Sequence, residues 1–163
     1  MSTFLWGNIF NRGISENDVI AQYWQKTPLF KNIPSRHIKS LVANMHIRNY
    51  HAGESVFRQG DQGAGAVLVL EGQVKIMASN TQVAQLDCGD FFGEIALAET
   101  DKRTADAISA SNSRLVYFMK ADLEEWIEIE PVLGNIFLMN LASILAQRLS
   151  LANQMLAHQS LAL

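Results

Sequence analysis

Apolar residues near the start of the chain recur with the spacing of an α-helix. This spacing predicts a helix from Ser15 to Lys26 and a second helix that follows Pro34. Ser15 and Asp18 have the three-residue separation of a capping pair at a helix start, and Pro28 is expected to end the first helix. Two helices are therefore predicted before residue 46.

The middle of the chain changes to short runs rich in β-forming residues. Turns that contain glycine separate these runs. Many short strands of this kind are typical of a jelly roll or of an antiparallel barrel. The expected fold is mainly β with flanking helices, a double-stranded β-helix or jelly-roll β-roll. The predicted strands are 47–50, 55–58, 66–70, 74–77, 83–86, 104–109 and 115–119.

The helical period returns after Lys120. It predicts a helix over 121–129 and a long helix from Pro131 to His158, since proline is well suited to the first helical position. Alternating steps of four and three residues along this last helix are typical of a seam that packs on another helix. The seam residues are Leu138, Ala142, Leu145, Leu149, Ala152 and Leu156.

The long helix also contains an uncharged stretch, from Pro131 to Gln147. This stretch is shorter than the roughly 20 apolar residues that span a bilayer, and it includes Asn135 and Asn140. A buried or interface helix is expected, with no transmembrane segment. The N-terminus lacks the basic lead-in of a secretory signal, so a cytoplasmic location is expected.

Composition narrows the classes of function. The 163 residues are 48% hydrophobic, which favours one folded domain over a disordered chain. A net charge of −3 argues against a protein that mainly neutralises nucleic-acid phosphates, and no direct DNA binding is expected. Cys88 is the one cysteine and the four histidines lack metal-ligand spacing, so no metal site is predicted. No nucleophile with its base is apparent, so the protein is expected not to be an enzyme and no catalytic residue is assigned.

The segment from Cys88 to Ala105 carries the candidate chemistry. Gly93 permits close approach of the backbone to a ligand, and a helical turn from Glu94 to Leu97 would present N–H groups to an anion. Arg103, expected at the start of the next strand, offers a planar two-pronged contact to a phosphate. Since phosphate would repel a carboxylate, Glu94 is expected to face a sugar. Together these groups indicate a site for a small phosphorylated nucleoside.

Phe92-Gly-Glu-Ile-Ala-Leu97 followed by Arg103-Thr-Ala105 resembles the phosphate-binding cassette of cyclic nucleotide-binding domains. The resemblance implies such a domain over residues 28–163, with its C-terminal dimerisation-type helix, after a helical extension over residues 1–27. It implies that Glu94 holds the ribose 2′-hydroxyl and that Arg103 pairs with the cyclic phosphate. The ligand-binding residues implied are Gly93, Glu94, Ile95, Ala96, Arg103, Thr104, Arg148 and Asn153.

The resemblance also bears on the base of the nucleotide. A hydroxyl at Thr104 is linked in the family with tolerance of cyclic GMP. In the last helix, Ala152 and Asn153 stand where a family member has a threonine–serine pair that reaches the adenine. A cyclic purine nucleotide is the expected ligand, cyclic AMP ahead of cyclic GMP, with no other cofactor.

The resulting hypothesis is a stand-alone sensor that signals by moving its C-terminal helix to an unknown downstream partner, as a homodimer through that helix. One alternative is a ligand-free interaction or scaffold domain of the same fold, which a direct contact between Glu94 and Arg103 would indicate. The other is the sensor half of a trimmed transcription regulator, since no DNA-binding domain is expected before Leu163.

Overall fold

The computed structural model describes residues 14–99 and 102–160. Its N-terminal helices are α2 (Glu16–Lys26) and α3 (Ser35–Val42), with the short 3₁₀ helix η2 (Pro28–Phe30) between them. The predicted capping box is present: Ser15 Oγ accepts from the Asp18 N–H at 3.2 Å, and the Asp18 carboxylate accepts from the Ser15 N–H at 3.3 Å. Residues 1–13 of the expected extension lie outside the described residues.

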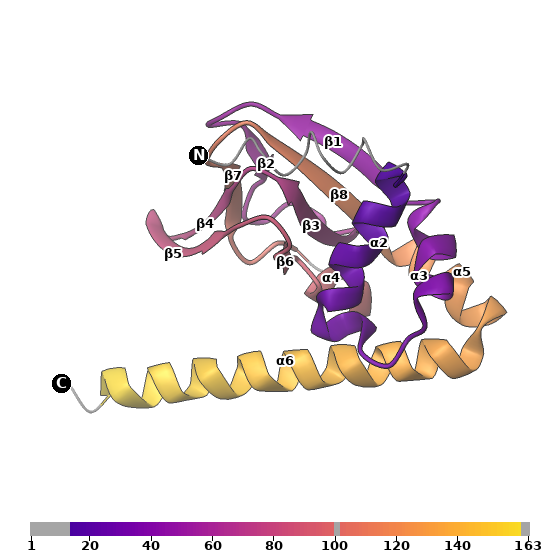
Figure 1. Cartoon of the computed structure of the whole chain (residues 1–163). Helices are drawn as coiled ribbons and strands as arrows, with labels where there is room; N and C mark the ends of the chain where they lie inside the picture. The colour runs from indigo at the N-terminus through magenta and orange to yellow at the C-terminus, as the bar shows by residue number, and fades with distance from the viewer. Residues whose placement is uncertain (1–13, 100–101, 161–163) are drawn as a thin grey trace.

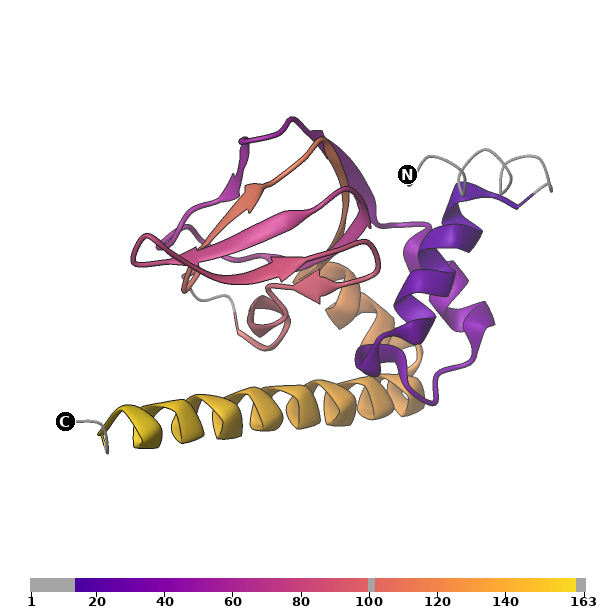
Figure 2. The same ribbon diagram turned by 60° about the vertical axis from the view of Figure 1, so that its left-hand side comes forward.

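Two four-stranded antiparallel sheets form the body of the molecule and confirm the predicted β-roll (Figures 1 and 2). A two-residue strand of this region was not among the predicted strands, because it is too short to show a period, whereas the helical turn expected over 94–97 is present as α4 (Ile95–Ala98). The first sheet has the order β1 (His46–Tyr50), β8 (Ser113–Met119), β3 (Gly65–Glu71) and β6 (Phe91–Phe92). The second has the order β2 (Ser55–Phe57), β7 (Asp106–Ser109), β4 (Val74–Ala78) and β5 (Thr81–Leu86).

Strand β3 is buried on both faces, which explains its unbroken apolar run. Leu68 and Leu70 belong to the core between the roll and the helices. Val67 and Val69 belong to the second core, between the two sheets. Because alternate side chains of a strand point to opposite faces, one strand serves both cores.

Helix α2 shares its core with the rest of the domain. The Trp24 side chain is fully buried, and its ring lies 5.6 Å from that of Phe30 and 6.0 Å from that of Phe118, between centroids. The boundary expected after residue 27 therefore coincides with no break in packing, and it stays a prediction.

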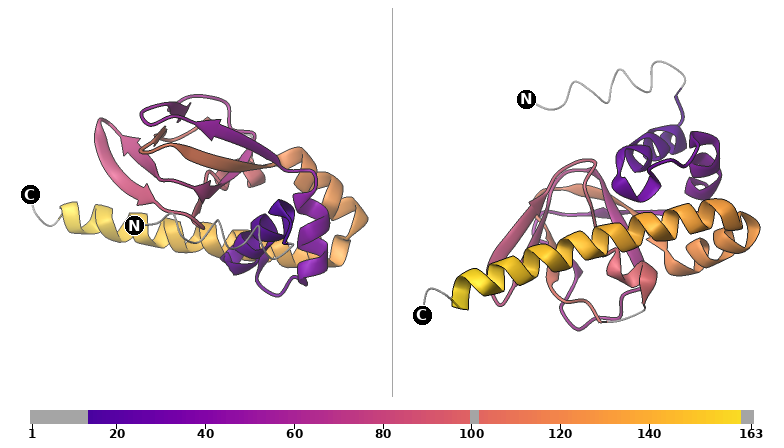
Figure 3. Two further views of the ribbon diagram at one scale, coloured as in Figure 1. Left: turned by 45° about the horizontal axis from the view of Figure 1, so that its top comes forward. Right: turned by 90° about the horizontal axis from the view of Figure 1, so that it is seen from below.

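Helix α5 (Lys120–Ile129) leads into α6 (Pro131–Ser160), which crosses beneath both the N-terminal helices and the roll (Figures 1 and 3). Phe137, Leu141 and Ile144 bury one stripe of the first half of α6 in the core. Most of the predicted seam lies on other faces of α6, and Leu149 is 64% exposed. The seam is thus left uncovered within one chain.

By length and composition alone, α6 over Pro131–Ala157 could cross a membrane. Within the domain, however, α6 makes polar contacts: the Asn140 amide donates to the carbonyl oxygens of Leu29 (3.0 Å) and Lys31 (2.8 Å). The first half of α6 is therefore fixed to η2 by hydrogen bonds as well as by apolar contacts.

Candidate functional site

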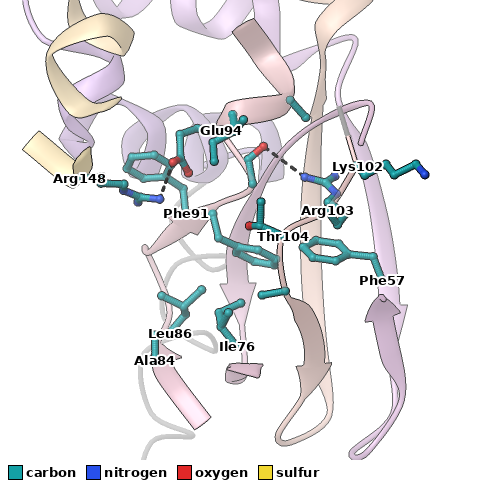
Figure 4. Close-up of a pocket in the computed structure, with 15 residues that line it drawn as sticks. Phe57, Ile76, Ala84, Leu86, Phe91, Glu94, Lys102, Arg103, Thr104 and Arg148 are labelled. Carbon is teal, nitrogen blue, oxygen red and sulfur yellow. Dashed lines mark hydrogen bonds and ion pairs between the residues drawn. The ribbon is translucent and has the colours of Figure 1, made fainter. Parts of the chain in front are cut away.

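A cavity of about 270 Å³ lies between the roll and α6, and we call it the α6 cavity (Figure 4). Its charged side chains Glu94, Arg103 and Arg148 lie toward one end, and the apolar side chains of Ile76, Ala84 and Leu86 lie toward the other. Such a division suits a ligand with one polar and one apolar part. The remaining lining residues are Phe57, Phe91, Phe92, Gly93, Ile95, Ala96, Lys102, Thr104 and Ala105.

Glu94 places a buried carboxylate in this cavity. It precedes the single-turn helix α4 (Ile95–Ala98), and its side chain is 1% exposed. One oxygen, Oε1, accepts from Arg148 Nη1, whereas Oε2 is buried without a hydrogen-bond partner. An unpaired buried acceptor of this kind costs about 1–3 kcal/mol, so Oε2 is poised to accept a hydrogen bond from a ligand.

Arg103 is held at the other side of the polar end by backbone carbonyl groups. Its Nη1 donates to the Gly93 oxygen at 3.2 Å and its Nη2 to the Gly65 oxygen at 3.0 Å, while Nε is buried without a partner. The guanidinium lies over the Phe57 ring, 4.2 Å from its centroid. Burial lowers the pKa of Arg103 from its ordinary value. An anion beside this partly desolvated cation would relieve the cost of its burial.

Arg103 lies in the loop before β7, and the prediction that it begins a strand is wrong. Its N–H donates to the Asp61 carbonyl oxygen at 2.7 Å, and its own carbonyl accepts from Gly60 at 2.8 Å. The backbone of this loop is thus bonded to the turn near residue 60, and the strand starts at Asp106.

Gly93 makes this arrangement possible. Its φ of +72° lies in the left-handed region, and a Cβ atom at this position would overlap Arg103 Nη1. The turn after it presents fewer free N–H groups than expected, because the Ala96 N–H donates to the Gly93 oxygen at 3.1 Å. The N–H of Ala96 is therefore already bonded within the turn.

Arg148 connects the cavity to α6. Its guanidinium pairs with Glu94 and lies 5.8 Å from the centroid of the Phe91 ring. The direct contact between Glu94 and Arg103 that would indicate a scaffold domain is absent from the hydrogen bonds and ion pairs of these two described residues. The Glu94 carboxylate and the Arg103 guanidinium therefore form no ion pair with each other.

The structure brings seven of the eight residues expected to bind a ligand to the wall of this one cavity: Gly93, Glu94, Ile95, Ala96, Arg103, Thr104 and Arg148. Asn153 lies about one and a half turns further along α6, exposed and outside the lining residues. Sequence reasoning missed Phe57 and Phe91, which support the two arginines. Aromatic residues in a β-rich segment are usual core residues, so the sequence gave no signal for that role.

Comparison with known proteins agrees with this geometry. The family described as cyclic nucleotide-binding domain matches residues 47–130. The cyclic AMP receptor protein of Thermus thermophilus is 28% identical over 128 residues, which are 76% of this chain and 57% of that protein. The cyclic nucleotide-gated channel alpha-4 of Mus musculus is 32% identical over 114 residues, 65% of this chain and 20% of that one.

The fold is shared with a solved structure. The crystal structure of the Thermus thermophilus catabolite activator protein superposes with a TM-score of 0.72 at 28% identity, and the match covers 82% of this chain and 63% of that one. The chain thus spans less than two thirds of these relatives. With a β-roll, a buried glutamate and an arginine on opposite sides of one cavity, and a family match over residues 47–130, the chain belongs to the cyclic nucleotide-binding domain family.

Proposed function

We propose that this domain is a non-enzymatic sensor that binds a cyclic purine nucleotide in the α6 cavity, cyclic AMP ahead of cyclic GMP. The observation that carries the proposal is the pair of unsatisfied buried groups, Glu94 Oε2 and Arg103 Nε. The first can accept a ribose hydroxyl, and the second belongs to a cation that can pair with a phosphate. The apolar end, with Ile76 and Leu86, offers a surface for the base.

The signal would leave through α6. A ligand hydroxyl that donates to Glu94 Oε2 shares this carboxylate with Arg148, which donates to Oε1, so we expect binding to alter the contact that joins the second half of α6 to the roll. A ligand shifts such an equilibrium only by the difference of its affinity for the two states. The proposal also includes a cytoplasmic homodimer, which the exposed seam of α6 supports, and an effector that responds to the direction of α6.

Isothermal titration calorimetry tests the ligand. We expect saturable binding of cyclic AMP and weaker binding of cyclic GMP. We expect little binding of 5′-AMP, which has the same base and sugar but whose phosphate is not closed into a ring. Replacing Arg103 with Ala should weaken binding by about tenfold to a hundredfold, since a hydrogen-bonded charge is lost.

Arg58→Ala is the matched control, because Arg58 is exposed and is not among the residues that line the α6 cavity. It should keep most of the affinity for cyclic AMP. If the folded protein binds neither cyclic nucleotide at millimolar concentration, the proposed function is wrong, and the scaffold alternative takes its place.

A further inference from the structure

A second cavity, of about 580 Å³, opens at the other edge of the roll. Strands β1 and β2 are at one end of the two sheets, and β6 and β5 are at the other end. The α6 cavity is lined from β5 and β6, whereas this one is lined from β1 and β2, so we call it the β1 cavity. Its lining residues are His46, Ile47, Arg48, Val56, Phe57, Asp61, Gln62, Ala64, Gly65, Arg103, Tyr117 and Met119.

Arg103 and Phe57 belong to the walls of both cavities. The two terminal nitrogens of Arg103 donate one to each side: Nη1 to Gly93, which lines the α6 cavity, and Nη2 to Gly65, which lines the β1 cavity. A single guanidinium, stacked on one ring, therefore forms the partition between two spaces.

The wall of the β1 cavity offers hydrogen-bond donors. The Tyr117 and Tyr50 hydroxyl groups are hydrogen-bonded to each other. Such a pair uses one of its two protons for the contact, so the other proton remains available to an acceptor. Burial and the bond to Tyr50 raise the pKa of Tyr117, so its hydroxyl stays protonated at neutral pH. Arg103 Nε, which is buried without a hydrogen-bond partner, belongs to the side chain that the two cavities share.

The remaining lining favours an anion with an apolar body. Arg48 provides a cation: its guanidinium lies 4.8 Å from the centroid of the Tyr50 ring, and its side chain is 62% exposed and forms an ion pair with Glu54 at 3.7 Å that a ligand carboxylate would have to share. The nearby carboxylate of Asp61 is engaged in a turn, where it accepts from the Arg58 N–H at 2.7 Å. Ile47, Val56 and Met119 make up much of the apolar lining.

We propose that the β1 cavity is a second ligand site, which binds a small organic monoanion: a carboxylic acid with an aromatic or branched apolar body. Its carboxylate would accept from Tyr117 and pair with Arg48 and Arg103, and its apolar body would lie against Ile47 and Met119. Because Arg103 is shared, this ligand draws the guanidinium away from the α6 cavity. This coupling through Arg103 rests on the proposed function. It means that each ligand lowers the affinity of the domain for the other.

Methyl NMR of the full chain can tell the two cavities apart. With labelled isoleucine and methionine methyl groups, Ile47 and Met119 report on the β1 cavity, and Ile76 and Ile95 report on the α6 cavity. The probe is benzoate, and benzyl alcohol is its uncharged counterpart. We expect benzoate to shift Ile47 and Met119 in a saturable way, with smaller changes at Ile76 and Ile95, and benzyl alcohol to bind far more weakly.

Two variants test the donors without emptying the cavity. Tyr117→Phe removes one hydroxyl, and Arg48→Gln removes the cation at position 48. Each change should lower the affinity for benzoate about tenfold, the usual loss for a hydrogen bond to a charged group. The control is Arg36→Gln, which removes a cation on α3 outside the cavity and should leave the benzoate affinity unchanged. Circular dichroism of each variant shows whether the fold is kept.

The proposal is overturned if benzoate shifts only Ile76 and Ile95, if no saturable shift occurs, or if benzyl alcohol binds as well as benzoate. The antagonism is measured apart, as the change in cyclic AMP affinity when benzoate is present. A domain that binds benzoate but no cyclic nucleotide would disprove the proposed function and leave the second site standing. Equal cyclic AMP affinity with and without saturating benzoate would disprove the shared use of Arg103.

Discussion

An alanine at residue 93 has no room for its Cβ atom beside Arg103. Alanine at this position would lower the stability for two separate reasons: the positive φ of the backbone and the overlap of Cβ with the guanidinium. Gly53 carries only the first penalty, since its φ is +84° and a Cβ atom there would face open space, with no neighbouring group within 4 Å. These two glycines therefore allow the two penalties to be measured apart.

We expect Gly53→Ala to lower the free energy of unfolding by about 1 kcal/mol, the usual cost of alanine at a positive φ. Gly93→Ala should lower the free energy of unfolding further. It should also weaken the binding of cyclic AMP, because Arg103 must leave its two carbonyl partners. Urea unfolding and calorimetry give the two quantities. Equal losses of stability in the two variants would show that Arg103 moves aside at no cost.

The Asp18 carboxylate makes part of the stability depend on pH. Its ion pair with Lys39 and its bonds to Ser15 hold the pKa of Asp18 below the usual value of 3.8. A group with a lowered folded-state pKa stabilises the protein above its usual pKa, and this contribution is lost as the pH falls through the folded-state value.

The difference in unfolding free energy between the natural protein and Asp18→Asn should therefore be present at pH 7 and should shrink as the pH falls below 3.8. Urea unfolding at several pH values measures it. A difference that stays constant down to acidic pH would mean that the carboxylate acts through its shape and not through its charge.

Among the elements, α6 depends on a polar contact within an apolar interface. Asn140 satisfies two carbonyl groups of η2 and the residue after it, whereas Asn135 on the same helix is exposed. We expect Asn140→Leu to lower the free energy of unfolding by about 1–3 kcal/mol, because both carbonyl groups lose their donor. Asn135→Leu is the control, with a change within about 0.5 kcal/mol. Thermal unfolding distinguishes the two, and equal effects would contradict the role of Asn140.

Sequence alone predicts the elements that have a period or a cap of their own. The capping box at Ser15, the two-sided apolar run of β3 and the proline start of α6 are local signals, and the structure confirms them. Strand β6 is two residues long and pairs only with β3, so nothing local marks it. Its existence follows from the chain returning beside a strand that lies about twenty residues or more earlier in the sequence.

The same division holds for the candidate site. Gly93, Glu94 and Arg103 are close in sequence, so a short motif predicts that they share a cavity. The ion pair of Glu94 with Arg148 joins residues 54 positions apart, and only the docking of α6 creates it. The β1 cavity likewise brings together strands that are far apart in the sequence, β1, β2 and β8, and no motif spans them.

At the scale of the whole molecule, the uncovered seam of α6 suggests a second copy of the chain. The seam residues Leu149 and Leu156 are 64% and 61% exposed on a helix that extends beyond the roll (Figure 1). We expect analytical ultracentrifugation to give twice the 18.1 kDa of one chain. Leu149→Glu places a charge in the seam and should make the protein monomeric. Gln147→Glu, on the same helix but outside the seam, should leave the dimer intact. A natural protein that sediments as a single chain would rule out the dimer.

Arg148 lies near the middle of α6 and divides the helix into two segments of different character. Before it, the backbone is packed against a hydrophobic core; after it, the described residues through 157 are exposed. Amide hydrogens before Arg148 should thus exchange with solvent slowly, and those after it should exchange quickly in an isolated chain. The second half of α6 lies beyond the ion pair of Arg148 with Glu94, so under the proposed signalling we expect a small rearrangement at Glu94 to give a larger displacement at the far end of the helix.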